Sequence, residues 1–138
     1  MSRESGSEDT ARFAGDLVST NSPVLLPEEL SAVAALPANS ALLIVHRGPG
    51  QGSRFLLDQD LTVAGRHPEA DIFLDDVTVS RRHAQFMREG RTFTVSDMGS
   101  MNGTYVDGQS TETQQLITGM EVMIGKFRLT FYASEKDR

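Results

Sequence analysis

From residue 40 onward, short runs of apolar residues alternate with turn-forming glycines, asparagines and aspartates. Runs that are rich in β-branched and aromatic residues and bounded by such turns are typical of β-strands. Hairpin-type turns are predicted at 89–91 and at 107–108. Strands are predicted at residues 41–47, 54–57, 61–64, 72–74, 83–88, 92–96, 104–106, 121–124 and 128–132. Because no helices alternate with these strands, the pattern predicts an all-β fold, a β-sandwich of about ten to eleven short strands.

Residues 1–39 have a different pattern. The first nine contain no apolar residue after Met1, which is the composition of disordered chains. Residues 27–36 begin with a proline and two acidic residues and continue with spaced apolar residues, which predicts a short helix. We therefore expect a mostly disordered, acidic regulatory tail at 1–39 with one or two helical turns, a sandwich domain at 40–133, and a short polar tail at 134–138.

Composition excludes several classes of site. The 138 residues include no cysteine and three scattered histidines, so neither a disulfide nor a metal centre is expected, and nothing points to a cofactor. The net charge of −6 leaves no basic stripe for a nucleic acid. The longest apolar runs, 32–36 and 41–45, are too short to span a membrane, so we expect a cytoplasmic protein without membrane contacts.

Three segments, at 65–68, 77–83 and 97–104, collect polar residues between the predicted strands. They offer guanidinium groups, hydroxyls, a carboxamide and glycine N–H groups, a donor set that suits a tetrahedral oxyanion such as phosphate. Ser80, His83 and Asp97 are the residue types of a catalytic triad. However, the serine and the histidine are three residues apart in one loop and no nucleophile elbow accompanies them. We therefore expect a binding protein without catalytic residues.

The motifs Gly65-Arg66, Ser80-Arg81-Arg82-His83 and 99–106 (GSMNGTYV) follow in order on a predicted sandwich. In this order and spacing the chain resembles the forkhead-associated (FHA) domain, a phosphothreonine-recognition module, from about residue 42 to residue 131. Recognition of phosphorylated motifs by arginine-based sites is a general binding mode.

The resemblance implies a role for each polar residue. Arg66 and Arg81 would contact the phosphate, and Ser80 would hydrogen-bond one of its oxygens. Ser100 would complete the oxyanion site, and Asn102 would bind the ligand backbone beside the phosphothreonine. Four further residues would support the loops: Gly65, His83, Gly99 and Gly103.

The tail narrows the resemblance. Glu8 and Asp9 precede Thr10, and Phe13 follows it by three residues. With this tail, and with the stretches 40–86 and 124–129 (IGKFRL), the chain is similar to the actinobacterial family of oxoglutarate dehydrogenase inhibitors and glycogen accumulation regulators. That family has a glutamate followed by two adjacent threonines, whereas here Asp9 replaces the first. Thr10 is therefore the expected phosphorylation site.

The family resemblance also implies a mechanism. The unphosphorylated protein would bind and control the oxoglutarate dehydrogenase complex, NAD-dependent glutamate dehydrogenase and glutamate synthase. Phosphorylation of Thr10 by a Ser/Thr protein kinase would make the tail bind its own FHA domain and block those partners. An alternative stays open, in which the protein is a general adaptor that recognises phosphothreonine on a kinase or another protein in trans.

Overall fold

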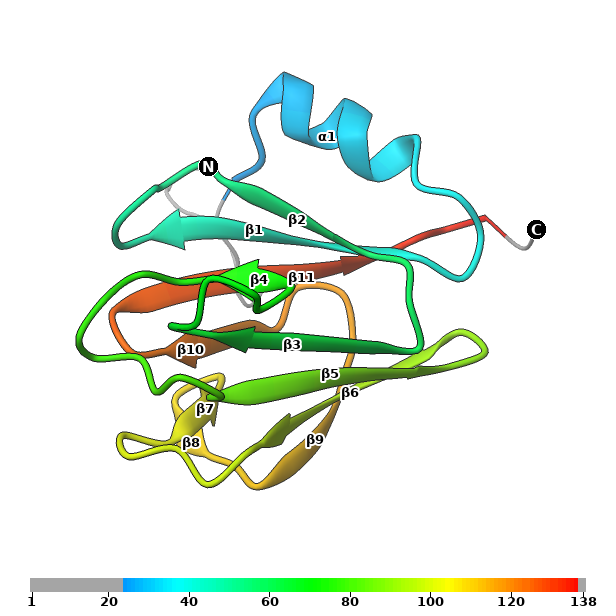
Figure 1. The fold of residues 1–138 in the computed structure, drawn as a ribbon. Coiled ribbons are helices and arrows are strands. Elements are labelled where there is room, and N and C mark those ends of the chain that lie inside the picture. The colour runs from blue at the N-terminus through cyan, green and yellow to red at the C-terminus, as the bar shows by residue number, and fades with distance from the viewer. Residues whose placement is uncertain (1–23, 137–138) are drawn as a thin grey trace, which may run out of the picture.

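The computed structural model describes residues 24–136, so the expectations for Thr10 and its neighbours lie outside the described residues. Within this range the chain forms one short helix and eleven strands in two sheets that pack face to face (Figure 1). The predicted β-sandwich is therefore confirmed. The described helix is not long and apolar enough to cross a membrane.

The first sheet has six strands and contains both ends of the domain, because β1 pairs with β11 from Ala41 opposite Ala133 onward. Its strands are, in spatial order, β2 (Arg54–Leu57), β1 (Ala41–Arg47), β11 (Phe127–Ala133), β10 (Glu121–Ile124), β7 (Thr104–Val106) and β8 (Gln109–Ser110). The second sheet has five strands, in the order β4 (Ile72–Phe73), β3 (Leu61–Gly65), β5 (Ala84–Glu89), β6 (Thr92–Asp97) and β9 (Thr113–Leu116). All pairs are antiparallel except β3 with β4.

The core lies between the inner faces of the two sheets. Leu43 of β1 is completely buried, and Phe131 of β11 packs its ring against Phe93 of β6 with 5.4 Å between the ring centroids. Such tilted aromatic pairs stabilise a core beyond the apolar area that they bury. The core therefore joins the first sheet directly to the strand that leads into the third polar segment.

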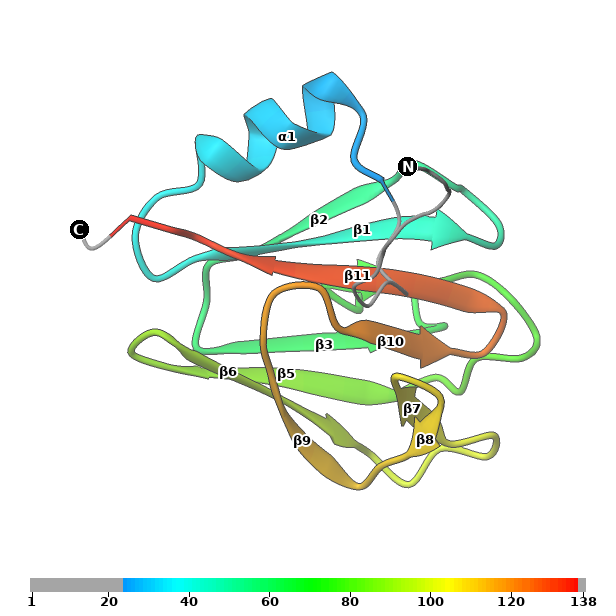
Figure 2. The ribbon, with the colours of Figure 1, turned by 180° about the vertical axis from the view of Figure 1, so that it is seen from behind.

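The helix α1 (Pro27–Ala34) lies on the outer face of the first sheet (Figure 2). Pro27 occupies its first turn, and the Glu29 carboxylate accepts the Leu26 N–H at 2.9 Å, which satisfies a free donor at the helix start. Leu36, just after the helix, is 4% exposed and packs with three outward-facing residues of the sheet: Leu42, Ile44 and Tyr132. Residues 24–39, which the sequence analysis assigned to the tail, thus include a segment that is packed on the domain.

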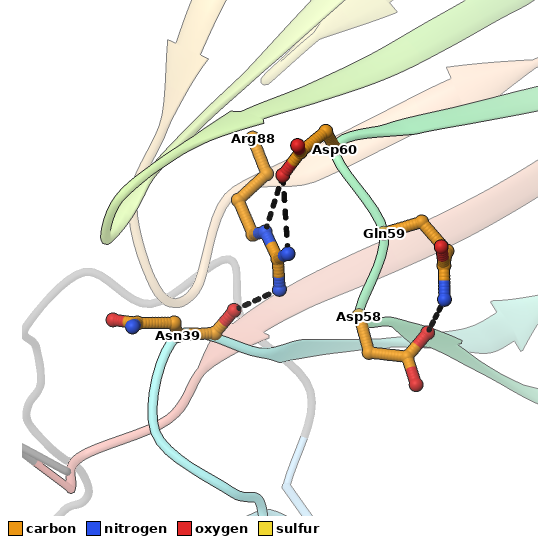
Figure 3. Close-up of polar contacts among 5 residues, drawn as sticks. All are labelled: Asn39, Asp58, Gln59, Asp60 and Arg88. Carbon is orange, nitrogen blue, oxygen red and sulfur yellow. Dashed lines mark hydrogen bonds and ion pairs between the residues drawn. The ribbon is translucent and has the colours of Figure 1, made fainter.

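Arg88 of β5 binds the C-terminal end of the segment 24–39 (Figure 3). Its guanidinium group donates to the backbone oxygen of Asn39 at 2.8 Å and contacts the Asp60 carboxylate at 3.1 Å and 3.3 Å. One side chain of the second sheet therefore fixes both the turn before β1 and the turn before β3.

Candidate functional site

Three loops meet at one end of the sandwich, on the left in Figure 1. They are the first loop (66–71, after β3), the second loop (74–83, after β4) and the third loop (98–103, after β6). Ser80 joins all three, because its carbonyl accepts the Arg66 N–H and its Oγ accepts the Met101 N–H, both at 2.9 Å. The three predicted polar segments are thus parts of one surface.

Gly65 lets the first two loops approach each other. A Cβ atom at this position would lie 2.0 Å from the carbonyl oxygen of Arg81 and 3.1 Å from that of Ser80. No L side chain fits there without moving the second loop. In the third loop, Gly99 and Gly103 have φ angles of +75° and +84°, which favour glycine for a different, conformational reason.

His83 lies beneath the loops and has no exposed surface. Its Nδ1 accepts the backbone N–H of Ser80 at 3.0 Å, and its Nε2 lies 2.8 Å from the carbonyl oxygen of Gly103. The first partner can only donate and the second can only accept, so the ring is the neutral tautomer with its hydrogen on Nε2. The contact to Ser80 uses the main chain and not the hydroxyl, which is unlike the nucleophile and base of a triad.

Asp97 organises the third loop. Its carboxylate accepts hydrogen bonds from the N–H groups of Gly99 and Ser100, at 2.9 Å and 3.0 Å, and from the hydroxyls of Ser100 and Thr104, at 2.5 Å and 2.7 Å. Burial raises the pKa of Asp97, but these hydrogen bonds together outweigh it and hold the pKa below the ordinary value. This role of Asp97 was not predicted from the sequence, although an aspartate two residues before a glycine is a turn signal.

The two serines of the predicted site differ in what their hydroxyls offer. Ser100 donates to Asp97 and accepts the Gly103 N–H at 2.9 Å, so its single hydroxyl hydrogen is directed into the loop. Ser80 Oγ accepts from Met101, and its own hydrogen has no acceptor among residues 24–136. In this conformation Ser80 presents a donor, whereas Ser100 braces the loop.

The arginines of the site are exposed. Arg66 donates from Nε to the carbonyl oxygen of Val79 at 3.2 Å, which fixes the plane of its guanidinium group while its terminal nitrogens have no partner in the described chain. The Arg81 side chain likewise has no hydrogen-bond or ion-pair partner within residues 24–136. Within the described residues, both guanidinium groups therefore keep donors that an anion can use.

A second set of contacts, around Thr78 of the second loop, borders the site on the side of the turn between β10 and β11. The exposed Asn102 donates from Nδ2 to the Thr78 carbonyl oxygen at 2.9 Å, which leaves its amide oxygen for a ligand. The Thr78 hydroxyl and N–H bond to Asp76 and, with the positive charges of Lys126 and Arg66 nearby, lower the pKa of Asp76. No place in the phosphate site was predicted for Asp76 from the sequence, because its role depends on this packing.

Sequence comparisons place this geometry among known proteins. A family model described as "Inner membrane component of T3SS, cytoplasmic domain" matches residues 44–135, which is the sandwich. The glycogen accumulation regulator GarA of Mycolicibacterium smegmatis is 54% identical over 94% of this chain and 84% of its own length. The oxoglutarate dehydrogenase inhibitor of Corynebacterium efficiens is 55% identical over 91% of this chain and 89% of its own.

Comparison with solved structures gives the same fold. A structure from an analysis of phosphothreonine-dependent FHA domain interactions has a TM-score of 0.65 and 27% identity, and covers 70% of this chain and 99% of its own. The FhaA FHA domain complexed with the intracellular domain of Rv3910 has a TM-score of 0.61 and 27% identity, over 66% of this chain and 98% of its own. The sandwich is therefore of the FHA type.

Proposed function

Because this chain belongs to the family of the glycogen accumulation regulators and oxoglutarate dehydrogenase inhibitors, we propose that it is a phosphothreonine-binding regulator of metabolic enzymes. The observation that carries this proposal is the arrangement around Ser80. Its hydroxyl, Arg66 and Arg81 lie on loops that are hydrogen-bonded to one another, and their donors have no competing acceptor in the described chain beyond the bond that orients Arg66. The proposed activity is binding and inhibition, not catalysis.

The chemistry of these donors matches a phosphate group. Phosphorylation of a threonine adds about −1.5 to −2 charges and three strong acceptors. Arg66 and Arg81 supply charge-assisted hydrogen bonds, Ser80 supplies a hydroxyl, and Asn102 binds the adjacent peptide backbone. An unmodified threonine offers one neutral hydroxyl and gives these arginines nothing comparable, so binding depends on phosphorylation.

We propose that the regulated partners are enzymes of 2-oxoglutarate metabolism and that the protein binds them in the cytoplasm. The name of the Corynebacterium relative supports the oxoglutarate dehydrogenase complex as a partner. NAD-dependent glutamate dehydrogenase and glutamate synthase are expected as further partners from the family resemblance. A Ser/Thr protein kinase would act on Thr10, and the phosphorylated tail would then bind its own FHA domain and displace these enzymes.

Two measurements test the function. Calorimetry of the full chain with a peptide of residues 4–16 is expected to show binding when Thr10 is phosphorylated and none when it is not. Affinity capture with the unphosphorylated full chain is expected to retain purified oxoglutarate dehydrogenase complex and to lose it after phosphorylation. Absence of phosphopeptide binding would refute the phosphothreonine site.

The trans adaptor is the second candidate. It is favoured by the structural neighbour whose FHA domain is complexed with the intracellular domain of another protein. An adaptor would capture phosphorylated proteins and would ignore the unphosphorylated dehydrogenase complex. The same capture experiment therefore separates the two functions.

A further inference from the structure

A cavity of about 420 Å³ adjoins the proposed phosphothreonine site on the side of the first loop. Arg81 lines it and is also one of the proposed phosphate contacts, so the cavity and the site share a wall. The other lining residues are Val63, His67, Glu69, Ala70, Asp71 and Arg82. Residues next to a phosphothreonine held by Arg81 would therefore reach this cavity.

Two further side chains give the cavity hydrogen-bond donors. Arg82 is exposed, and its guanidinium group has no hydrogen-bond or ion-pair partner within residues 24–136. His67 Nδ1 accepts the backbone N–H of Glu69 at 3.1 Å, so a neutral ring carries its hydrogen on Nε2 and can donate it. With Arg81, these groups can bind a carboxylate.

The cavity also contains two acidic residues, which limits what it can hold. The Asp71 carboxylate accepts the Val63 N–H at 2.9 Å and is thereby held on β3. The exposed Glu69 carboxylate has no such partner in the described chain and repels an anion. Because these charges offset the two arginines, the cavity fits a carboxylate that a bound peptide brings to it rather than a free anion.

The opposite flank of the site has a different character. A cavity of about 300 Å³ there is lined by two apolar side chains, Tyr105 and Met123, together with Thr78, Asn102, Gly103, Gly125 and Lys126. In this chain's own sequence, two acidic residues precede Thr10 and Phe13 follows it. The Lys126 charge on that flank lies close enough to the Asp76 carboxylate to lower its pKa, whereas Arg82 has no hydrogen-bond or ion-pair partner within residues 24–136. Arg82 is therefore the better partner for acidic residues before the threonine.

We propose that Arg82 and His67 form a subsite that selects phosphothreonine preceded by acidic residues. This inference rests on the proposed phosphothreonine binding, which supplies the anchor. The subsite sets which phosphorylated sequences bind, while the phosphate contacts set whether any binds. Its ligands include this chain's own Glu8-Asp9-phosphothreonine sequence and any other peptide of the same chemistry.

The test compares two peptides of residues 4–16 phosphorylated on Thr10, one with the natural acids and one with Glu8→Gln and Asp9→Asn. Full-length protein is expected to bind the acidic peptide about three- to fivefold more tightly, the upper part of the range for an exposed ion pair. Arg82→Gln should bring this ratio close to one. Arg91→Gln, an exposed arginine in the turn between β5 and β6 at the opposite end of the sandwich, is the matched control and should keep it. Glu69→Gln should increase the ratio, because it removes the opposing charge.

The ratio is measured on one protein sample at a time, so partial unfolding of a variant does not change it. Failure of the unmodified protein to bind either phosphopeptide would refute phosphothreonine binding itself. Tight but equal binding of both peptides would overturn only the acidic subsite. An unchanged ratio in Arg82→Gln would do the same.

Discussion

A single missing Cβ atom at Gly65 sets the distance between the first and second loops. In Gly65→Ala the new carbon would meet the Arg81 carbonyl oxygen at 2.0 Å, so the second loop must move. We expect a loss of about 1–3 kcal/mol in the free energy of unfolding, as for other overpacked sites, and at least tenfold weaker phosphopeptide binding. Urea unfolding and calorimetry measure the two effects. Gly52→Ala adds a carbon with no neighbour within 4 Å, so it should leave binding unchanged, although its φ of +97° makes this substitution destabilising as well.

Mutations of residues that contact the phosphate should weaken binding, whereas mutations of residues that brace the third loop should lower stability. Arg66→Ala and Arg81→Ala remove exposed side chains, so each should weaken phosphopeptide binding at least about tenfold without lowering the melting temperature, since a charge-assisted hydrogen bond contributes about 1.5–3 kcal/mol. Ser100→Ala removes the hydrogen bonds to Asp97 and Gly103, and should lower the free energy of unfolding by about 1–2 kcal/mol. Loss of stability in Arg81→Ala, measured by thermal unfolding, would contradict this division.

Asp97 should make stability depend on pH in the acidic range. Its pKa is lower in the folded state than in the unfolded chain, where it is about 3.9. The stabilisation it provides is therefore fully present above the unfolded value and is lost as the pH falls through the folded pKa. Urea unfolding of the wild type and Asp97→Asn should show a difference in stability that is constant from about pH 5 to 7 and shrinks below about pH 4. A difference that grows on acidification would contradict the assignment.

At the scale of elements, hydrophobic patterning predicted nine of the eleven described strands and missed β8 and β9. β9 has one buried residue, Leu116, after three exposed polar ones, so it carries no alternation for a sequence pattern to detect. The run 41–45, in contrast, is continuously apolar in sequence, and all five of its residues are buried. Such a run is typical of a strand that is covered on both faces. The outer face of this strand is covered by residues at and after α1, although the sequence interpretation had placed residues 1–39 in a mostly disordered tail.

The candidate site could be predicted as a set of residue types but not as a set of contacts. The family resemblance carried by the motifs implied that Arg66, Ser80 and Asn102 belong to one binding site. Which hydroxyl remains available depends on side-chain rotamers in the third loop. Sequence alone therefore could not distinguish Ser80 from Ser100, whose hydrogen is directed to Asp97.

The packing of α1 gives a prediction at the same scale. Leu36→Ala should lower the free energy of unfolding by about 2–5 kcal/mol, because it leaves a cavity between the helix segment and the sheet. The Tyr132 hydroxyl is buried and makes no hydrogen bond of ordinary geometry in the described chain; burial raises the pKa of this phenol, and the neighbouring Thr130 hydroxyl opposes that rise only in part. Tyr132→Phe removes that unpaired group and should be neutral or stabilising in urea unfolding. A loss above about 1 kcal/mol would indicate a partner for the hydroxyl.

For the whole molecule, the packed segment shortens the tether of the proposed switch. The segment 24–39 is held on the sheet. The linker therefore runs from Thr10 to Val24, about fourteen residues, rather than from Thr10 to Ser40, about thirty residues. A flexible chain of that length spans roughly 20 Å root-mean-square, and a domain of this size has a radius of gyration of about 13 Å. A flexible linker of that length would be long enough for the proposed intramolecular binding, at an effective concentration on the order of millimolar.

Phosphorylation of Thr10 should then close the molecule on itself. A phosphopeptide contact with a micromolar Kd, held at millimolar effective concentration, favours the closed form by about a thousand to one. We expect the phosphorylated protein to stay monomeric, to show shifted amide resonances in the loops around Arg66, Ser80 and Asn102, and to lose the dehydrogenase complex in affinity capture.

Three variants separate closure from inhibition. Thr10→Ala should keep enzyme binding and ignore the kinase. Thr10→Glu should close poorly, because a planar carboxylate with one charge replaces a tetrahedral dianion. Arg81→Ala in the phosphorylated protein should open the tail, yet it need not restore enzyme binding if the enzymes use the same arginine, so closure is measured by tail resonances and inhibition by enzyme assay. Phosphorylation that leaves the loop resonances unchanged would contradict intramolecular binding and favour the adaptor that acts in trans.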